Sequence, residues 1–277
     1  MSVLPLSRAR WAAADTAVLT GRTLAHWARR PGEVLFGLLF PVLLLLMFGY
    51  LFGGAMALSD GDGVPALSDG AGYREFLLPG MVAMTMLFGV ETTYTAVAVD
   101  TARGVTDRFR SLPMSRAAVV TGRAVADLLH SAVALAVVLA CGVLIGWQPH
   151  RGPAAALAAV ALLLLLRFAM IWLGVYLALL LRRPEAVAAL QILVWPLGFA
   201  SNAFVAPATM PGWLAAVAAW NPLSATVAAT RDLFGNPGWG AGSWPAEHAV
   251  ALAVAWPLLL VAVFLPLSVR RWQRLAR

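Results

Sequence analysis

The chain alternates between long apolar runs and shorter stretches rich in arginine, glycine or aspartate. A helix that crosses a lipid bilayer needs about 20 mainly apolar residues. The runs that reach this length lie at residues 34–53, 76–99, 117–147, 154–181, 186–205 and 246–269. The pattern therefore predicts an all-α integral membrane protein with six transmembrane helices, and we expect residues 1–277 to form a single membrane domain.

The composition agrees with this interpretation. Hydrophobic residues make up 61% of the chain and charged residues only 12%, whereas a soluble domain is about half apolar and a quarter charged. A soluble protein of this composition would expose large apolar patches and aggregate. The one cysteine, Cys141, rules out a disulfide within the chain and a thiol metal cluster, and we expect no metal site.

The distribution of arginine predicts the orientation. The 20 basic residues are all arginine. Four clusters lie on the same side of the membrane if the chain crosses six times, and they are residues 8–30, 103–116, 182–183 and 270–277. Because basic residues gather in cytoplasmic loops, both termini are expected in the cytoplasm. Short clusters between apolar runs also indicate contacts with anionic lipid rather than with nucleic acid.

Two segments are predicted to form helices that do not span. Residues 7–30 have a modest amphipathic pattern, which predicts a helix in the inner membrane interface or a cytoplasmic helix against a partner protein. In the stretch 206–247, Asn221 is a good N-cap, Pro222 suits the first helical position and Gly235 suits the residue after the end. With a second short helix over 211–220, this stretch predicts a re-entrant or interfacial hairpin on the outer side.

The loop at residues 100–116 has an amphipathic pattern of its own. Val105, Phe109 and Leu112 lie near one helical face, and Pro113 stops the helix. Asp107, Arg108, Arg110 and Arg116 supply charge around that face. The pattern is equally consistent with a peg that docks into a partner's groove and with a solvated turn that follows the positive-inside rule.

Two charged residues, Glu91 and Arg167, lie deep inside apolar runs. A charge at the bilayer centre costs about 2.5–3.5 kcal/mol on insertion scales. Their depths differ by only about 3 Å at about 1.5 Å per residue, so an ion pair between helices is geometrically allowed. Such a pair could staple the fold, each charge could face a cavity or substrate pathway, or Glu91 could couple protons. Arg123 and Asp127 share a helical face and predict a local salt bridge.

No catalytic motif is present. A phosphate-binding P-loop requires a lysine, and the chain has none, so any use of ATP requires another polypeptide. Ser243 and His248 lie close enough in sequence to suggest an intramembrane serine protease, but no other feature supports that role. We therefore expect that the chain is not itself an enzyme.

Four stretches of the chain, taken in order, carry a family resemblance. The first two are RRPGEVLFGLLFPVLLLLMFGYLFG at 29–53 and YREFLLPGMVAMTMLFG at 73–89. The others are DTARGVTDRFRSLPMSRAAVVTGRAVADLL at 100–129 and FASNAFVAPATMPGWLAAVAAWNPLSATVAATRDLFGNP at 199–237. Together they reach from the first span almost to the sixth, and they resemble the ABC type-2 permeases, especially the daunorubicin-resistance-like drug exporters of actinobacteria.

The resemblance implies six spans, an N-terminal interfacial helix, a cytoplasmic coupling helix between spans two and three, and short outer helices before the sixth. It implies a homodimer of permease chains in the bacterial plasma membrane, with two ABC ATPase subunits that hold ATP and Mg while this chain binds no cofactor. The Asn221-Pro222 hairpin would form the outer gate. The coupling helix would contain Arg103, Gly104, Asp107, Arg108, Phe109, Arg110, Leu112 and Pro113.

The function that follows is the efflux of amphipathic small molecules, such as a drug, an antibiotic or a lipid, driven by the partner ATPase. One alternative is a secondary transporter that uses an ion gradient and titrates Glu91, but such transporters contain inverted repeats and the sequence shows no repeat. Another alternative is a membrane anchor for a biosynthetic complex. Association with an ATPase separates the exporter from both.

Overall fold

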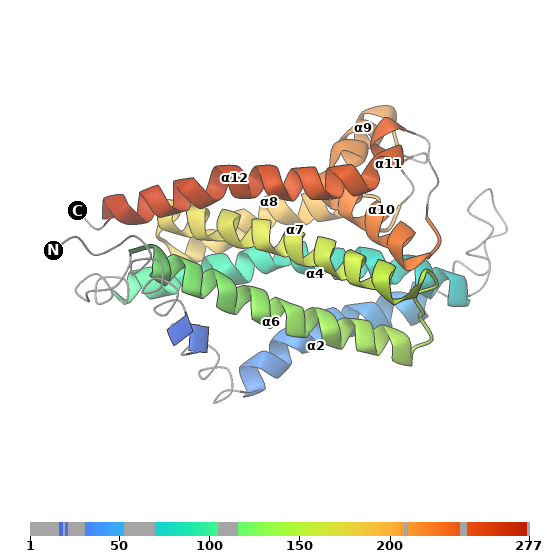
Figure 1. The fold of residues 1–277 in the computed structure, drawn as a ribbon, viewed down its shortest axis with the longest axis horizontal. Coiled ribbons are helices and arrows are strands. Elements are labelled where there is room, and N and C mark those ends of the chain that lie inside the picture. The colour runs from blue at the N-terminus through green and yellow to red at the C-terminus, as the bar shows by residue number, and fades with distance from the viewer. Residues whose placement is uncertain are drawn as a thin grey trace.

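The computed structural model describes residues 17–18, 20–21, 31–52, 70–104, 116–205, 207, 210–238 and 243–275. Within these ranges all regular structure is helical, which confirms the all-α class (Figure 1). The first elements are α2 (Pro31–Met47), η1 (Phe48–Phe52), α4 (Gly70–Ala102), α6 (Arg116–Leu144) and α7 (Gly152–Leu181). The others are η3 (Pro184–Ala186), α8 (Val187–Phe199), α9 (Gly212–Trp220), α10 (Pro222–Phe234), α11 (Trp244–Glu247) and α12 (Ala249–Leu275).

Four helices are long and apolar enough to cross a membrane, and they match the predicted second, third, fourth and sixth spans. They are Gly72–Ala102, Val120–Leu144, Gly152–Leu181 and Ala249–Arg274. Helices suit this environment because they satisfy their backbone donors and acceptors internally, where no water can do so. The ends of α7 are set locally: a proline stands in its first turn, and Arg182 ends it in the left-handed conformation at φ 54°.

The predicted first and fifth spans correspond to shorter apolar helices, Pro41–Tyr50 and Pro184–Phe199. The predicted fifth span extended to residue 205, but α8 ends at Phe199. Pro196 lies in its last turn, the Ala200 N–H donates to the Pro196 carbonyl at 2.7 Å, and residues 201–204 form a turn. Hydropathy continues through this turn, so the pattern alone could not show where the helix stops.

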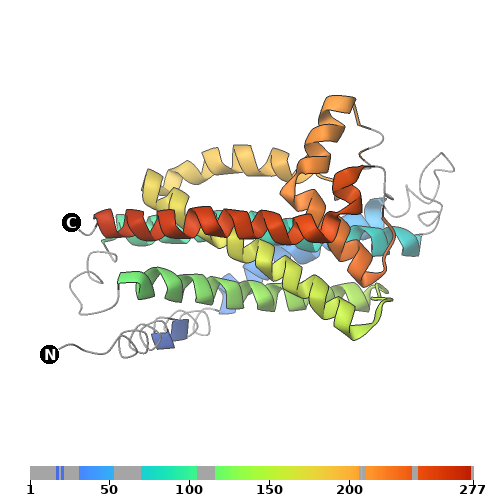
Figure 2. The ribbon, with the colours of Figure 1, turned by 45° about the horizontal axis from the view of Figure 1, so that its top comes forward.

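The centre of the bundle is α7, which packs along α4 on one side and α12 on another (Figures 1 and 2). In the apolar 18-residue stretch of α4, 72% is buried, whereas in the corresponding stretch of α12 only 11% is buried. The helix α4 is therefore the most deeply buried of the four spanning helices, although it is the least hydrophobic of them. Its burial leaves α12 and much of α6 to face the surroundings of the bundle.

The bundle has two chemically different ends. At one end α4 stops and α6 starts, and Tyr94 Oη donates to the Arg183 carbonyl at 2.7 Å. At the other end His150 Nε2 lies 2.9 Å from Glu75 Oε1. The ends of α4, α7 and α12 near which Arg103, Arg182, Arg183, Arg270, Arg271 and Arg274 lie belong to the first end. These six arginines therefore gather at one end of the bundle, whereas Arg167 is buried within it.

Two helices approach closely at Gly174 of α7. A Cβ atom at this position would lie 2.8 Å from the Val90 carbonyl oxygen and 3.2 Å from the Thr93 Cβ atom. Backbone cannot move aside as the end of a flexible side chain can, so only glycine permits this α4–α7 spacing.

We predict that Gly174→Ala lowers the free energy of unfolding by about 1–3 kcal/mol, because the methyl group forces α4 and α7 apart. The measurement is denaturation of the detergent-purified protein followed by circular dichroism. Gly212→Ala is the control, since nothing lies within 4 Å of a Cβ atom there. Equal stability of the two variants would contradict the close approach.

Candidate functional site

A buried polar seam joins α4, α6 and α7, and Arg167 is at its centre. The Arg167 side chain is only 3% exposed. Its Nε donates to Ser131 Oγ at 2.7 Å, and its Nη2 donates to Thr93 Oγ1 at 2.8 Å. Because an isolated cation is costly in an apolar interior, these bonds fix which faces of the three helices meet.

A glycine makes room for this guanidinium. A Cβ atom at Gly89 would lie 2.6 Å from Arg167 Cζ and 2.7 Å from Nη1. Nη1 has no hydrogen-bond partner in the described part of the chain. The planar group therefore lies against the bare backbone of α4, at a place where any side chain would displace it.

The seam continues toward the end of α4. Thr93 Oγ1 donates to Asp127 Oδ2 at 3.0 Å, which links Arg167 to a carboxylate through one hydroxyl. Arg123 Nε lies 3.1 Å from Asp127 Oδ1, which confirms the salt bridge predicted within α6. Arg123 Nη1 also lies 3.1 Å from Asp100 Oδ2 on α4. The same arginine therefore ties the last turns of α4 to the first turns of α6.

Glu91 and Arg167 form no ion pair in the structure, although both are described and both were candidates for one. Glu91 instead accepts hydrogen bonds from Gln191 Nε2 at 3.0 Å and Trp195 Nε1 at 2.9 Å, both on α8. Residues two apart on a helix point about 200° apart. Since Gly89 and Thr93 face α7, Glu91 must point away from it. Glu91 and Arg167 therefore lie at similar depths in the membrane but point in different directions, so they form no ion pair.

A row of aromatic rings lies beside Glu91, and we call it the aromatic row. Phe88 stacks on Trp195 with ring centroids 5.1 Å apart. Contacts of 6.3, 5.8 and 5.3 Å then join Trp195 to Phe199, Phe199 to Phe204 and Phe204 to Phe48. The row joins α4, α8, the turn after α8, and η1. Beyond it α8 exposes Ile192, Leu193 and Leu197.

Near the C-terminal end of α8, Asn221 caps α10 as predicted. Its Oδ1 accepts from the Leu223 N–H at 2.9 Å. Its Nδ2 donates to the carbonyl oxygens of Leu197 and Ala200 at 2.7 and 3.2 Å. The cap therefore also fastens the end of α8. Pro222 occupies the first turn of α10, and Gly235 ends it at φ 74°.

Arg231 fastens α10 to two further segments. Its side chain is 2% exposed and donates to the carbonyl oxygens of Phe76, Asn202 and Ala203 at 3.1, 2.9 and 2.7 Å. Its Cζ lies 3.8 Å from the Phe76 ring centroid, a favourable cation–π geometry. Burial lowers the pKa of Arg231 to about 9, which leaves the group charged at neutral pH.

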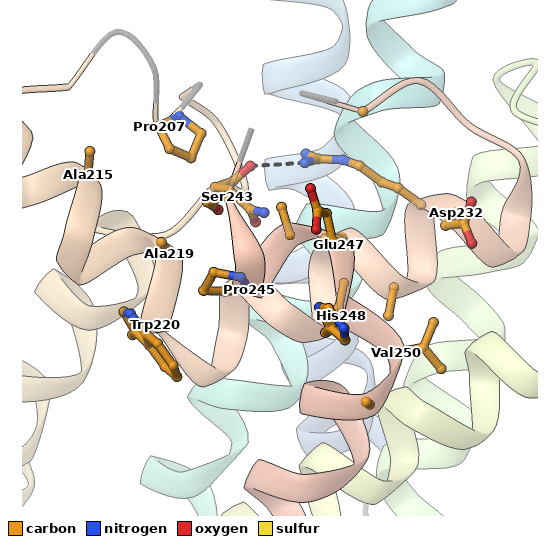
Figure 3. Close-up of a pocket in the computed structure, with 18 of the residues that line it drawn as sticks. Pro207, Ala215, Ala219, Trp220, Asp232, Ser243, Pro245, Glu247, His248 and Val250 are labelled. Atoms are coloured by element: carbon orange, nitrogen blue, oxygen red, sulfur yellow. Dashed lines mark hydrogen bonds between the residues drawn. The ribbon is translucent and has the colours of Figure 1, made fainter. Parts of the chain in front are cut away.

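A cavity of about 1070 Å³ lies among α9, α10, α11 and the start of α12 (Figure 3). Trp220, Asp232 and Glu247 come from different walls of it. Ser243 and His248 line it too, but His248 Nδ1 is 3.0 Å from the Trp244 carbonyl oxygen, and its ring stacks on Trp244 at 4.4 Å. This arrangement gives no support to a serine–histidine pair. No group of three metal-ligating side chains occurs in the described ranges.

Comparison with known proteins decides the family. The family model described as "ABC-2 type transporter" matches residues 15–234. A permease of Streptomyces coeruleorubidus named for daunorubicin resistance, DrrB1, is 34% identical over 265 residues, which cover 95% of this chain and 88% of the relative.

The chain belongs to the ABC-2 type transporter family. A putative transport permease of Cyanophora paradoxa, ycf38, is 28% identical over 80% of this ABC-2 chain and 74% of its own length. A probable doxorubicin resistance permease of Mycobacterium tuberculosis, DrrC, is 26% identical over 83% and 80%. The resemblance noted in the sequence is therefore confirmed.

In this ABC-2 protein the predicted coupling segment is described only where it begins. The Arg103 N–H donates to the Val99 carbonyl at 3.0 Å, and Gly104 follows α4 at φ 66°. The other predicted coupling residues lie outside the described residues, and they are Asp107, Arg108, Phe109, Arg110, Leu112 and Pro113. The described residues therefore show how the segment leaves α4, and its helix stays a prediction.

Three residues of the candidate site were missed from the sequence. Arg231 was not a candidate site residue, because nothing in the sequence marks which carbonyl oxygens a turn leaves free. Gln191 and Trp195 were not singled out, although a glutamine and a tryptophan in the same apolar run are candidates for binding Glu91. A polar side chain in a spanning run is the signal to look for, because it needs a partner there.

Double-mutant cycles test the seam. Arg167→Leu combined with Thr93→Val is expected to show a coupling free energy of about 0.5–3 kcal/mol in unfolding experiments, because the two residues share a buried hydrogen bond. Arg167→Leu combined with Glu91→Gln is expected to be additive within about 0.5 kcal/mol. Strong coupling between Glu91 and Arg167 would show that they pair after all.

Proposed function

We propose that this chain is the permease subunit of an ATP-driven exporter of amphipathic small molecules, such as a drug, an antibiotic or a lipid. The observation that carries the proposal is its membership of the ABC-2 family together with 34% identity to a daunorubicin resistance permease over most of both chains. The absence of lysine agrees with it, because the phosphate-gripping P-loop must then lie on a separate subunit.

We place six spans in the bacterial plasma membrane with both termini in the cytoplasm. The continuous helical stretch of α2 and η1 is about 33 Å long at about 1.5 Å per residue, enough for a hydrocarbon core of about 30 Å. The stretch of η3 and α8 is only about 25 Å long. Its crossing would be completed by the turn held by Asn221 and Arg231.

Coupling to ATP enters through residues 103–113 in this proposal. The Asp100–Arg123 pair clamps the two helix ends between which this segment lies. A partner that pushes on the segment would therefore move α4 and α6 together, and the Arg167 seam would carry the movement to α7. Two ABC ATPase subunits, which hold ATP and Mg, would each dock on one chain of a permease homodimer.

The outer gate is the α9–α10 hairpin. Asn221 fastens it to the end of α8, and Arg231 fastens it to α4 through the Phe76 carbonyl. A shift of α4 relative to α8 would therefore move the α9–α10 hairpin on the outer side. Closure of the ATPases drives export if the ATP-bound state binds cargo less tightly from the inside, because a ligand shifts a two-state equilibrium only by its differential affinity.

Reconstitution with the ABC ATPase encoded nearest to the gene tests this function. The purified chain alone is expected to hydrolyse no ATP, and the two proteins are expected to copurify and hydrolyse it together. Phe109→Ala should keep the complex assembled but reduce cargo-stimulated hydrolysis about tenfold, because the apolar knob of the docking segment is lost.

The control is Phe168→Ala. It also removes a phenyl ring, but one on α7 that packs within the bundle and lies outside the docking segment. It should retain stimulated hydrolysis in proportion to the folded protein. Hydrolysis that tracks the amount of permease when no ATPase is present would overturn the proposal.

A further inference from the structure

Glu91 lies on the face of α4 opposite the Arg167 seam, so it does not join the buried polar contacts that hold α4, α6 and α7 together. It lies about three turns from the nearest end of α4, faces away from the Arg167 seam, and is partly exposed. Its partner helix α8 packs mainly against α4 and buries only Leu190, Val194 and Gly198. A carboxylate facing plain hydrocarbon is strongly disfavoured, so a ligand or neighbour that suits a negative charge would stabilise this face.

The carboxylate is oriented but not neutralised. Gln191 and Trp195 each donate one neutral hydrogen bond, to different oxygens of Glu91. Each carboxylate oxygen can accept a second bond. No arginine or histidine forms an ion pair with Glu91 within the described ranges, because Arg123 pairs with Asp100 and Asp127 while Arg167 bonds to Ser131 and Thr93. One acceptor direction per oxygen therefore remains, and no ion-pair partner occupies it within the described ranges.

The groups around this charge define what it can bind. Trp195 holds Glu91 through its N–H and stacks on Phe88 through its ring, so an aromatic surface begins beside the carboxylate. Phe199 continues that surface at 6.3 Å from Trp195. A carboxylate set beside aromatic faces suits an organic cation, because both the charge and the ring quadrupoles attract it.

We propose that Glu91, Gln191 and Trp195 form a binding site for the cationic group of an amphipathic aromatic cation, whose apolar body lies along Phe88 and Phe199. The inference rests on the proposed function, because the site would select the cargo of the exporter. Glu91 is then the specificity-determining residue, and Gln191 and Trp195 are positioning residues that aim its oxygens. A second copy of the chain covering α8 is the competing occupant.

Equilibrium binding of two probes to the full-length chain in lipid nanodiscs tests the site. The probes are radiolabelled tetraphenylphosphonium, which is a permanent cation, and triphenylphosphine oxide, which is neutral and has similar rings. Glu91→Gln keeps the acceptor for one of the two hydrogen bonds and removes the charge. It should weaken tetraphenylphosphonium binding about tenfold or more and change binding of the neutral probe less than about twofold.

Two further variants separate recognition from folding. Glu91→Asp keeps the charge and should retain most of the preference for the cation. Glu75→Gln removes a carboxylate of the same helix that pairs with His150 at the outer end, and should bind both probes as the unmodified chain does. Because no ATPase is present in this binding assay, a negative result does not contradict the proposed exporter function. Conversely, a chain that fails to associate with an ATPase does not contradict a positive binding result.

The inference is overturned if Glu91→Gln binds the cation as tightly as the unmodified chain, or if it weakens both probes equally. The first result would mean that another group or a second copy of the chain occupies this face. The second would mean that Glu91 only holds α8 in place. Absence of any cation binding to the unmodified chain would overturn it too.

Discussion

Inside hydrocarbon a guanidinium must find its hydrogen bonds within the protein, and this constraint organises the bundle. Arg167 joins three long helices through two hydroxyls and lies against a glycine that leaves it room. Arg231 joins α10 to α4 and to the turn after α8 through three carbonyl oxygens. The two arginines act at different places along the bundle, and each holds elements that are distant in sequence.

The arrangement divides α4 into two functional faces. The face with Gly89 and Thr93 is committed to the interior, where polar groups satisfy one another and fix the helix spacing. The face with Phe88 and Glu91 turns toward α8 and stays partly open. In the proposed mechanism the first face transmits movement from a partner, and the second face contacts cargo. The same helix ends at the segment where we place the coupling contact.

Local features were predictable from the sequence. The Asn221 cap and the Arg123–Asp127 bridge depend on neighbours within a few residues, so spacing alone identified them. The partners of Glu91 and Arg231 were not predictable in this way. Counting residues gives the depth of a side chain in the membrane, but the direction in which it points depends on how each helix is rotated against its neighbours. That rotation is set by packing, including the glycine contacts at Gly89 and Gly174.

The most direct test of the central claim is transport by inside-out vesicles that contain the chain and its ABC ATPase. The cargoes are rhodamine 123, a fluorescent cation, and Nile red, a neutral fluorescent amphipath. Accumulation is expected to require ATP and a functional ATPase and to persist when a protonophore collapses the proton gradient. Accumulation that stops with the protonophore and does not require the ATPase would contradict it and identify a gradient-driven transporter instead.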